Sequence, residues 1–380
     1  MNVPATGRPV AWWIFPTLPV VAAAAAFAWM LTAELTRIYG MTSPAGDLAY
    51  DQQLVWSVSH SNFAGIHLEL IVVVLAAIEK LWPSPALILI FSAAGVAATA
   101  PAAYLFLRAL LPADRAESPW LAVALSAPIP FWAAADMFDA ENIALPLALL
   151  AAWAGLRGRR VAMWILCALV LMCKEDQAYT VGMIGILVGA YGPPEVNKHW
   201  RPIVYLALAW FVIGLAIVHS VVPGVLTLLF TLIVALGIGA RKFLEMRSFR
   251  PAVALLVMLP ALLLAWSAGR IPPALGADPG AYSQPNAVVE LRMATDMIPA
   301  DAPVDADAGL AVWLADRHSI KDFPDRLDAT CYVVIDREAY LNGPAQPKQR
   351  KSAIDALPGS GRSVLFDDGR FQVWGPVGGD

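Results

Sequence analysis

The stretch AMWILCALVLMCKEDQAYTVGMIGIL, residues 162–187, indicates the architecture of this chain most directly. Apolar residues fill both halves of the stretch. The charged residues Lys174, Glu175 and Asp176 leave room for only one turn between the halves. A helix needs roughly 20 mostly apolar residues to cross a bilayer. The pattern therefore predicts two neighbouring membrane helices joined by a short, charged turn.

The composition of the whole chain points to the same class of protein. Hydrophobic residues make up 59% of it and charged residues 15%, and the mean hydropathy is +0.61. Those values are typical of a polytopic membrane protein, and they exclude a disordered chain and a basic protein that binds nucleic acid. From about residue 285 the sequence is polar and acidic. We therefore predict a mainly α membrane helix bundle over residues 1–270 and a small soluble α/β domain over residues 285–380.

Hydropathy predicts about nine spanning helices, together with interfacial helices. One segment, 64–82, is ambiguous because it is apolar but contains the charged residues Glu69, Glu79 and Lys80. The nine expected spans cover residues 11–33, 85–108, 118–135, 142–157, 161–174, 177–192, 202–220, 222–240 and 251–268.

The distribution of Lys and Arg decides whether segment 64–82 crosses the bilayer. If the segment stays in the interface, the cytoplasmic loops hold far more basic residues than the outer loops, as the positive-inside rule requires. If it crosses, every later loop changes side and the asymmetry reverses. We therefore expect a multi-pass protein of the bacterial cytoplasmic (inner) membrane with a cytoplasmic N-terminus and an extracytoplasmic C-terminal domain. The outer basic residues are then Arg37, Lys80 and Lys174, and the inner ones are Arg8, Arg108, Arg115, Arg157, Arg159, Arg160, Lys198, Arg201, Arg241, Lys242, Arg247 and Arg250.

In this topology three acidic regions share the outer face. They are the long first outer loop 34–84 with Asp47 and Asp51, the turn with Asp139 and Glu141, and the charged turn described above. Carboxylates at membrane depth are costly unless they have a partner, a cavity or a function. We therefore expect the three regions to converge on one outward-facing cavity.

The C-terminal domain shows the patterns of both helix and strand. Residues 286–297 have helical periodicity, and residues 329–336 have the pattern of a buried strand. Segments 363–366 and 370–374 flank the sequence Asp367-Asp368-Gly369, which is typical of a β-hairpin turn. The sequence therefore predicts a mixed α/β domain.

Asp47 and Asp51 stand four residues apart in GDLAYDQQLVW, residues 46–56. On a helix this spacing places both carboxylates on one face, where they repel each other unless a cation, a basic group or a proton intervenes. A divalent metal ion, or a general base beside an acceptor hydroxyl, explains such a pair. The simpler interpretation is a solvated amphipathic helix with Asp47 near its N-cap.

Other polar residues also have two interpretations. His67 could be a metal ligand, a proton shuttle or a phosphate partner, or an interfacial histidine without a role. Asp139 and Glu141 could line a site, or they could form a solvated turn in which Asp139 caps the next helix. The charged turn could hold a local ion pair, or Lys174 could bind a phosphate while one of its acidic neighbours binds a metal or acts as a structural clasp.

The chain contains, in this order, the motifs GDLAYDQQLVW (46–56), His67 before an apolar segment that ends in LWPSP (81–85), Phe138-Asp139, and Lys174-Glu175-Asp176. This ordered set resembles the bacterial and archaeal membrane family called domain of unknown function 2079. The likeness covers roughly residues 10–220, and the polar end adds IPADAPV (298–304) and YVVID (332–336). That family in turn resembles a branch of the GT-C glycosyltransferases, which use a lipid-phosphate-linked sugar on the outer side of the membrane.

The resemblance implies an integral membrane glycosyltransferase of the inverting type, with a polyprenyl-phosphate-linked sugar as donor. Asp47 and Asp51 would be its catalytic pair, one of them accepting the proton of the acceptor hydroxyl. A divalent metal ion (Mg²⁺, Mn²⁺ or Ca²⁺) would lie between Asp51 and Glu175. The implied substrate-binding residues are Gln52, His67, Asp139, Glu141, Lys174, Glu175 and Asp176.

Two motifs depart from the family pattern. The family has His-Phe-Ser-Pro where this chain has HLEL (67–70), and Phe-Asp-Phe-His-Pro-Glu where it has FDAENI (138–143). A site histidine is therefore replaced, and Glu141 is the candidate substitute for the missing glutamate. The alternative function is that of a non-enzymatic membrane protein, either a transporter or a scaffold whose outer domain binds a partner. A transporter commonly contains an inverted repeat, and the sequence shows none.

Overall fold

The computed structural model describes most of the chain, with gaps that include the region of the last two expected spans. The described residues are 14–41, 46–60, 68–111, 118–130, 133, 138–218, 285–317, 319–324, 330–338 and 346–376. The expected spans 222–240 and 251–268, as well as His67, lie outside these residues.

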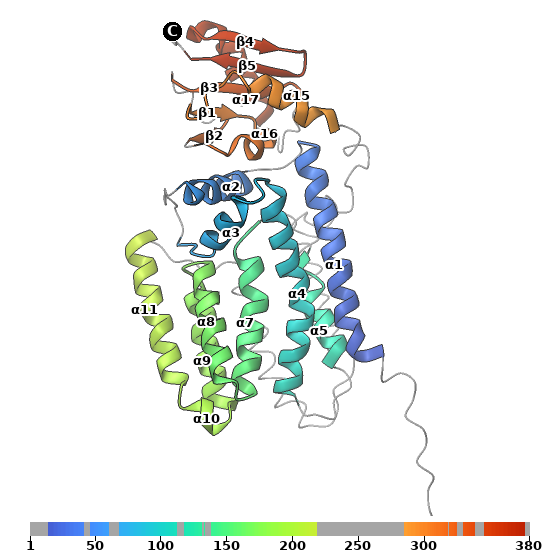
Figure 1. Ribbon diagram of the computed structural model, residues 1–380, viewed down its shortest axis with the longest axis vertical. Helices are drawn as coiled ribbons and strands as arrows, with labels where there is room; N and C mark the ends of the chain where they lie inside the picture. The colour runs from blue at the N-terminus through green and yellow to red at the C-terminus, as the bar shows by residue number, and fades with distance from the viewer. Residues whose placement is uncertain are drawn as a thin grey trace, which may run out of the picture.

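Long apolar helices run side by side and form one body of the molecule (Figure 1). Among the described residues, three stretches are long and apolar enough to cross a membrane: Thr17–Tyr39, Ala86–Leu110 and Pro194–Ile217. Three further apolar helices in the described residues are shorter, with 14 to 16 residues each. The bundle thus contains α1 (Ile14–Tyr39), α4 (Ala86–Leu110), α7 (Glu141–Leu156), α8 (Arg160–Cys173), α9 (Gln177–Tyr191), the short α10 (Pro194–Asn197) and α11 (Trp200–Val218).

These helices follow the expected spans closely, with two differences. The expected span 118–135 contains the nine-residue helix α5 (Ser118–Ser126) in its described part. Helix α1 continues to Tyr39, so the first outer loop begins six residues later than predicted. Burial of the apolar side chain of Ile38, which is 0% exposed, stabilises these added residues. The total of nine spans stays a prediction.

Helix α4 lies at the centre of the bundle, packed between α1 and α7. Gly95 of α4 lies against the backbone of Asn142 at the start of α7, where a Cβ atom would collide with the carbonyl group. The buried side chain of Asn142 also donates a hydrogen bond to Ser92 Oγ of α4, at 2.9 Å. Close backbone approach and a buried hydrogen bond together fix the first turn of α7, which positions Glu141.

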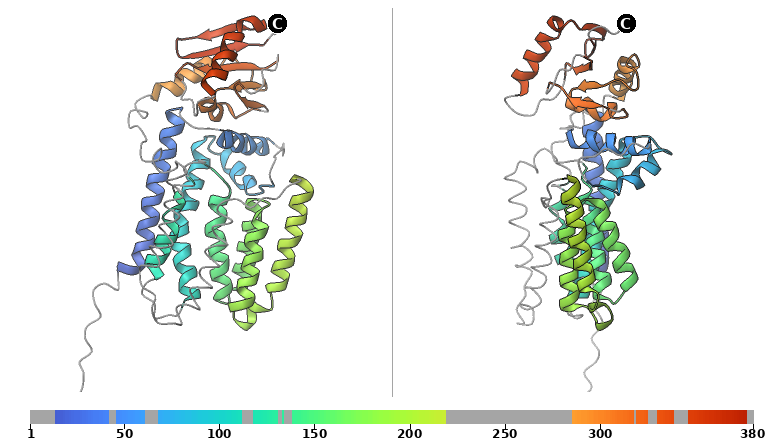
Figure 2. Two further views of the ribbon diagram at one scale, coloured as in Figure 1. Left: turned by 180° about the vertical axis from the view of Figure 1, so that it is seen from behind. Right: turned by 90° about the vertical axis from the view of Figure 1, so that its left-hand side faces the viewer.

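Two short helices, α2 (Gly46–Ser59) and α3 (Val72–Glu79), pack against each other at one end of the bundle (Figures 1 and 2). The eight residues of α3 span about 12 Å at a rise of 1.5 Å per residue. That length is well below the roughly 30 Å of a hydrocarbon core. Helix α3 is therefore too short to span a membrane by itself, and the interfacial position of segment 64–82 stays a prediction.

The C-terminal residues fold into a domain with a five-stranded sheet at the same end of the bundle (Figure 1). The strand order is β2-β1-β3-β5-β4, with β1 parallel to β2 and β3, and β5 antiparallel to β3 and β4. The elements are α15 (Pro285–Thr295), β1 (Val304–Ala306), α16 (Ala308–Ala311), β2 (Ile320–Asp322), β3 (Tyr332–Asp336), α17 (Gln346–Ala356), β4 (Ser363–Asp367) and β5 (Phe371–Gly375). The predicted helix at 286–297, the strand at 329–336 and the C-terminal hairpin are confirmed.

The domain rests on the end of α1 and on α2. Trp313 Nε1 donates a hydrogen bond to Ile38 O at 3.0 Å, and its ring lies 5.4 Å from that of Tyr39. Gln53 of α2 donates to Arg317 O at 3.0 Å. Buried apolar residues of the domain, including Val312, belong to the same core as residues of α2 and α3. Side chains of the membrane part and of the domain therefore meet at this boundary.

Candidate functional site

Acidic residues from three segments surround one lysine at the end of the bundle that faces α2 and α3. Lys174 lies in the turn between α8 and α9, and its Nζ atom is 3.4 Å from Asp139 Oδ2. Its ammonium also lies within electrostatic range of three further carboxyl groups. We call this group the Lys174 cluster, and it consists of Glu69, Asp139, Glu141, Lys174, Glu175 and Asp176.

Backbone hydrogen bonds bind the charged turn to the first outer loop. Leu68 N donates to Glu175 Oε2 at 3.0 Å, and Ile71 N donates to Met172 O at 2.8 Å. Glu175 is 3% exposed. Glu175 therefore connects residues that are 107 positions apart, a contact that a structural clasp requires.

Asp139 has two partners at the beginning of α7. Its Oδ1 atom accepts a hydrogen bond from Glu141 N at 2.9 Å, while its Oδ2 atom pairs with Lys174. The carboxyl groups of Glu141 and Asp176 are hydrogen-bonded to each other. Two carboxyl groups share a hydrogen bond only when one of them carries a proton. The cluster therefore combines one ammonium group with more carboxyl groups than that charge can balance.

Helix α2 contributes residues to a different group. Asp51 is 6% exposed on this helix. The neighbouring Gln52 donates through Nε2 to Glu79 Oε1 at 2.7 Å and to Asp316 Oδ1 at 3.2 Å. Asp47 belongs to α2, but its side chain, like all of His67, lies outside what the structure describes. The side chain of Gln52 is thus hydrogen-bonded to Glu79 and Asp316. The convergence of Asp47, Asp51 and His67 with the Lys174 cluster stays a prediction.

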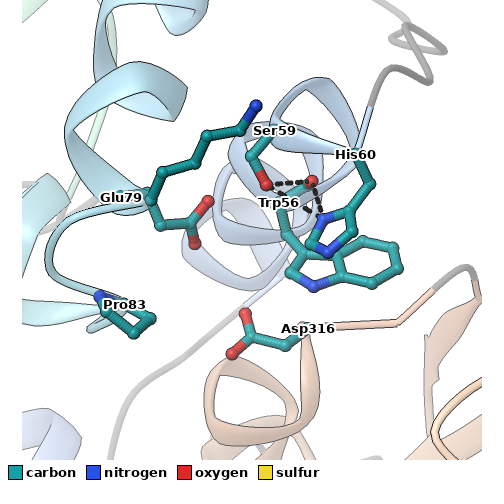
Figure 3. A pocket seen from close by; sticks show the side chains of 7 residues that line it. Trp56, Ser59, His60, Glu79, Pro83 and Asp316 are labelled. Atoms are coloured by element: carbon teal, nitrogen blue, oxygen red, sulfur yellow. Dashed lines mark hydrogen bonds between the residues drawn. The ribbon is translucent and has the colours of Figure 1, made fainter.

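A cavity of about 310 Å³ opens where α2, α3 and the C-terminal domain meet. Figure 3 shows Trp56 and Ser59 on α2, His60 directly after it, Glu79 on α3 and Asp316 on the C-terminal domain. Both carboxyl groups are directed toward the space between them. We call it the Glu79 pocket, and it is lined by Trp56, Ser59, His60, Glu79, Lys80, Pro83 and Asp316.

Local contacts order the α2 side of this pocket. The imidazole of His60 stacks on the indole of Trp56, with ring centroids 4.3 Å apart. Ser59 Oγ donates to Trp56 O at 2.7 Å and lies 3.0 Å from His60 Nδ1. The last turn of α2 therefore presents an aromatic ring and an imidazole to the cavity in fixed positions.

Burial, followed by the negative charge of Asp316, raises the pKa of Glu79 from 4.5 to about 7. The hydrogen bond from Gln52, the electrostatic effect of His60 and, last, an interaction with Ser59 act in the opposite direction but do not cancel this effect. A buried carboxyl group without a sufficient counter-charge behaves in this way. Near neutral pH, Glu79 is therefore poised between its protonated and ionised forms.

The expected divalent metal ion has no complete ligand set in the part of the chain that the structure describes. No group of three or more His, Cys, Asp or Glu side chains there has the arrangement of a metal site. The metal between Asp51 and Glu175 stays a prediction, since the side chains of Asp47 and His67 are not described.

Three acidic residues at these sites have no role predicted from the sequence: Glu69, Glu79 and Asp316. Glu69 and Glu79 could have been found from the sequence, because each is an acidic residue that interrupts an otherwise apolar segment. Asp316 could not, because it lies in the polar domain, and only the packing of that domain on α2 brings it to Gln52.

One comparison identifies relatives of this chain. Residues 41–230, half of the chain, match the family described as Predicted membrane protein (DUF2079). No curated protein and no solved structure matches the chain.

Proposed function

This chain belongs to the predicted membrane protein family DUF2079, and we propose that it is a glycosyltransferase-like enzyme of the membrane. In this proposal a sugar is transferred, with inversion, from a polyprenyl-phosphate donor at the outer face. The main support is the Lys174 cluster, in which a single ammonium group stands among carboxyl groups at the end of the helix bundle. Helix α2 and the C-terminal domain lie at the same end of the bundle. They would cover a reaction site there.

Lys174 is the proposed partner of the donor phosphate. Its side chain is 18% exposed, and the Asp139 side chain that pairs with it is 35% exposed. A phosphate that replaces Asp139 at the ammonium group would gain a charge-assisted hydrogen bond. The same contact would stabilise the phosphate as it departs, because its negative charge grows when the bond to the anomeric carbon breaks.

Asp51, or Asp47 one helical turn earlier, is the proposed general base. The acceptor hydroxyl would give its proton to this carboxylate while its oxygen attacks the anomeric carbon and the donor phosphate leaves. A divalent metal ion held by Asp51 and Glu175 would add further neutralisation of the phosphate, and no step described here depends on it. The donor's polyprenyl tail would lie along the apolar helices.

The experiment uses the purified full chain in proteoliposomes with a panel of radiolabelled polyprenyl-phosphate sugars. We expect transfer or hydrolysis with at least one donor, and a fall of about 10²–10⁴-fold in Asp51→Asn, the usual effect of losing a general base. Asp301→Asn, at an exposed position of the C-terminal domain, is the matched control and should retain the wild-type rate. Full activity in Asp51→Asn would remove Asp51 as the base.

A proton-coupled carrier is the second candidate, because one specific contact favours it. The hydrogen bond between the carboxyl groups of Glu141 and Asp176 holds a proton close to Lys174, and such groups in membrane proteins form proton relays. The carrier would be favoured over the enzyme if no lipid-linked donor supports transfer or hydrolysis and the same proteoliposomes show proton-dependent solute flux.

A further inference from the structure

The Glu79 pocket contains an acceptor atom that no described residue satisfies. Glu79 is 4% exposed, and its Oε1 atom accepts the hydrogen bond from Gln52. Its Oε2 atom is buried, and no described donor reaches it with the distance and angle of a hydrogen bond. The nearby Ser59 hydroxyl donates to Trp56 O instead, and its effect on the pKa of Glu79 is the weakest of those that act on this group. Leaving a buried acceptor unmet costs about 1–3 kcal/mol, and more for a charged group. Because the carboxyl group points into the cavity (Figure 3), a ligand there is placed to supply the donor.

The charges around this atom favour a cationic donor. Asp316 faces Glu79 from the C-terminal domain, and the two acids share the amide group of Gln52 at 2.7 and 3.2 Å. Two carboxylates beside one neutral amide repel each other unless a positive charge joins them. Lys80 lines the same cavity, but it is exposed and is not among the charges that act on Glu79. A neutral hydroxyl group supplies a hydrogen bond but no such charge.

The indole of Trp56 and the volume of the cavity restrict the chemical class and the size of the ligand. Trp56 lines the pocket, and an indole ring attracts a cation within about 6 Å of its centre. The volume of about 310 Å³ lies at the lower end of the usual range of ligand sites, roughly 300–1,000 Å³. The pocket therefore suits a head group or a single sugar ring, and it is too small for a lipid chain.

We propose that the Glu79 pocket binds a primary ammonium group between the carboxylates of Glu79 and Asp316 and beside the indole of Trp56. The three N–H donors of such a group match the acceptors that converge there. The amine of a soluble amino sugar and the amine of a lipid head group have this same chemistry. This site is separate from the proposed transfer reaction and does not depend on it.

Saturation-transfer NMR on the full chain in phosphatidylcholine nanodiscs tests the proposal. The probes are ethanolamine and glucosamine, and the controls are ethylene glycol and glucose, which have a hydroxyl group in place of the amine. We expect binding of the amines alone. Glu79→Gln and Asp316→Asn should each weaken it by about tenfold or more, since each removes a charge-assisted hydrogen bond. Glu290→Gln and Asp301→Asn, at exposed positions, are the matched controls and should bind like the wild type.

Asp316 is exposed, so its variant keeps the test valid even if Glu79→Gln does not fold. Equal signals from glucose and glucosamine, or undiminished amine binding in Asp316→Asn and in folded Glu79→Gln, would overturn the proposal. Nanodiscs that contain phosphatidylethanolamine identify the source of the amine. Loss of the soluble-amine signal there indicates a lipid head group, and its retention indicates a soluble ligand.

The pH dependence provides an independent readout. Ethanolamine stays protonated near neutral pH, as alkyl ammonium groups do, so its binding should increase as Glu79 ionises around pH 7. His60, Lys80 and Asp316 face the same cavity from three elements. The increase should persist in His60→Gln and Lys80→Met and disappear in Glu79→Gln. An increase that persists in folded Glu79→Gln would contradict the assignment of Glu79 as the titrating ligand.

Discussion

The Lys174 cluster and the Glu79 pocket both place buried carboxyl groups near the short helices α2 and α3, but they balance the charge differently. The first contains its own cation, since Lys174 lies 3.4 Å from Asp139 and near the other acids. The second sets Glu79 and Asp316 against each other across a cavity of about 310 Å³. A cluster with an internal counter-ion is held together by the fold, whereas a like-charged pair beside an open volume is suited to receive a ligand.

The largest effect on stability should come from Gly95→Ala, which separates the two regions experimentally. The added Cβ atom would collide with the backbone of Asn142 and displace the start of α7, which belongs to the Lys174 cluster. We expect a loss of about 1–3 kcal/mol in stability, as for other overpacked sites, measured by thermal unfolding in detergent. Amine binding at the Glu79 pocket should be retained.

Gly182→Ala is the matched control for that substitution. Its Cβ atom would lie 3.8 Å from the Cβ atom of Ala207, an ordinary contact. Stability equal to or above that of the wild type is expected there. Equal losses of stability in Gly95→Ala and Gly182→Ala would show that the backbones of α4 and α7 do not approach unusually closely at Gly95.

Lys174→Met should have the next largest effect, because it removes the only positive charge of the Lys174 cluster. We expect a loss of about 2 kcal/mol, below the value for a fully buried pair because Asp139 is partly exposed. Circular dichroism during heating measures it, with Lys198→Met at an exposed position as control. A stability unchanged from the wild type would mean that protons alone balance the acids.

The smallest effect is a pH dependence that belongs to the Glu79 pocket. The pKa of the Glu79 carboxyl group is raised from 4.5 to about 7 in the folded state. The folded state therefore binds the proton of this carboxyl group more tightly than the unfolded state does. The stabilisation is therefore complete below pH 4.5 and is lost as the pH rises through 7. Glu79→Gln should abolish this loss, so the melting-temperature difference between the variant and the wild type should grow in the variant's favour from pH 5 to pH 8. A difference that is constant over this interval would contradict the raised pKa.

Much of the fold was predictable because membrane spans depend on local hydropathy. Helices α4, α7, α8, α9 and α11 lie within a few residues of the expected spans. The two parallel strands β1 and β2 were not predicted, since three residues are too few to show a period of two. Their place in the sheet depends on pairing with distant residues.

The candidate site was predictable only in part, for a related reason. The acids beside Lys174 were found because charged residues are rare in apolar sequence. The hydrogen bonds from Gln52 to Glu79 and Asp316 join residues 27 and 264 positions apart, and nothing in the local sequence indicates them. The Glu79 pocket forms only when the C-terminal domain packs on α2.

Binding of unglycosylated polyprenyl phosphate tests the central claim, that Lys174 receives the donor phosphate, most directly. Native mass spectrometry of the full chain can compare the wild type with Lys174→Met, Lys174→Arg and Lys198→Met at matched lipid concentrations. We predict that affinity falls by about tenfold or more in Lys174→Met, the loss of one charge-assisted contact, and is largely restored in Lys174→Arg. It should be unchanged in Lys198→Met. Undiminished binding in a folded Lys174→Met variant would contradict the claim.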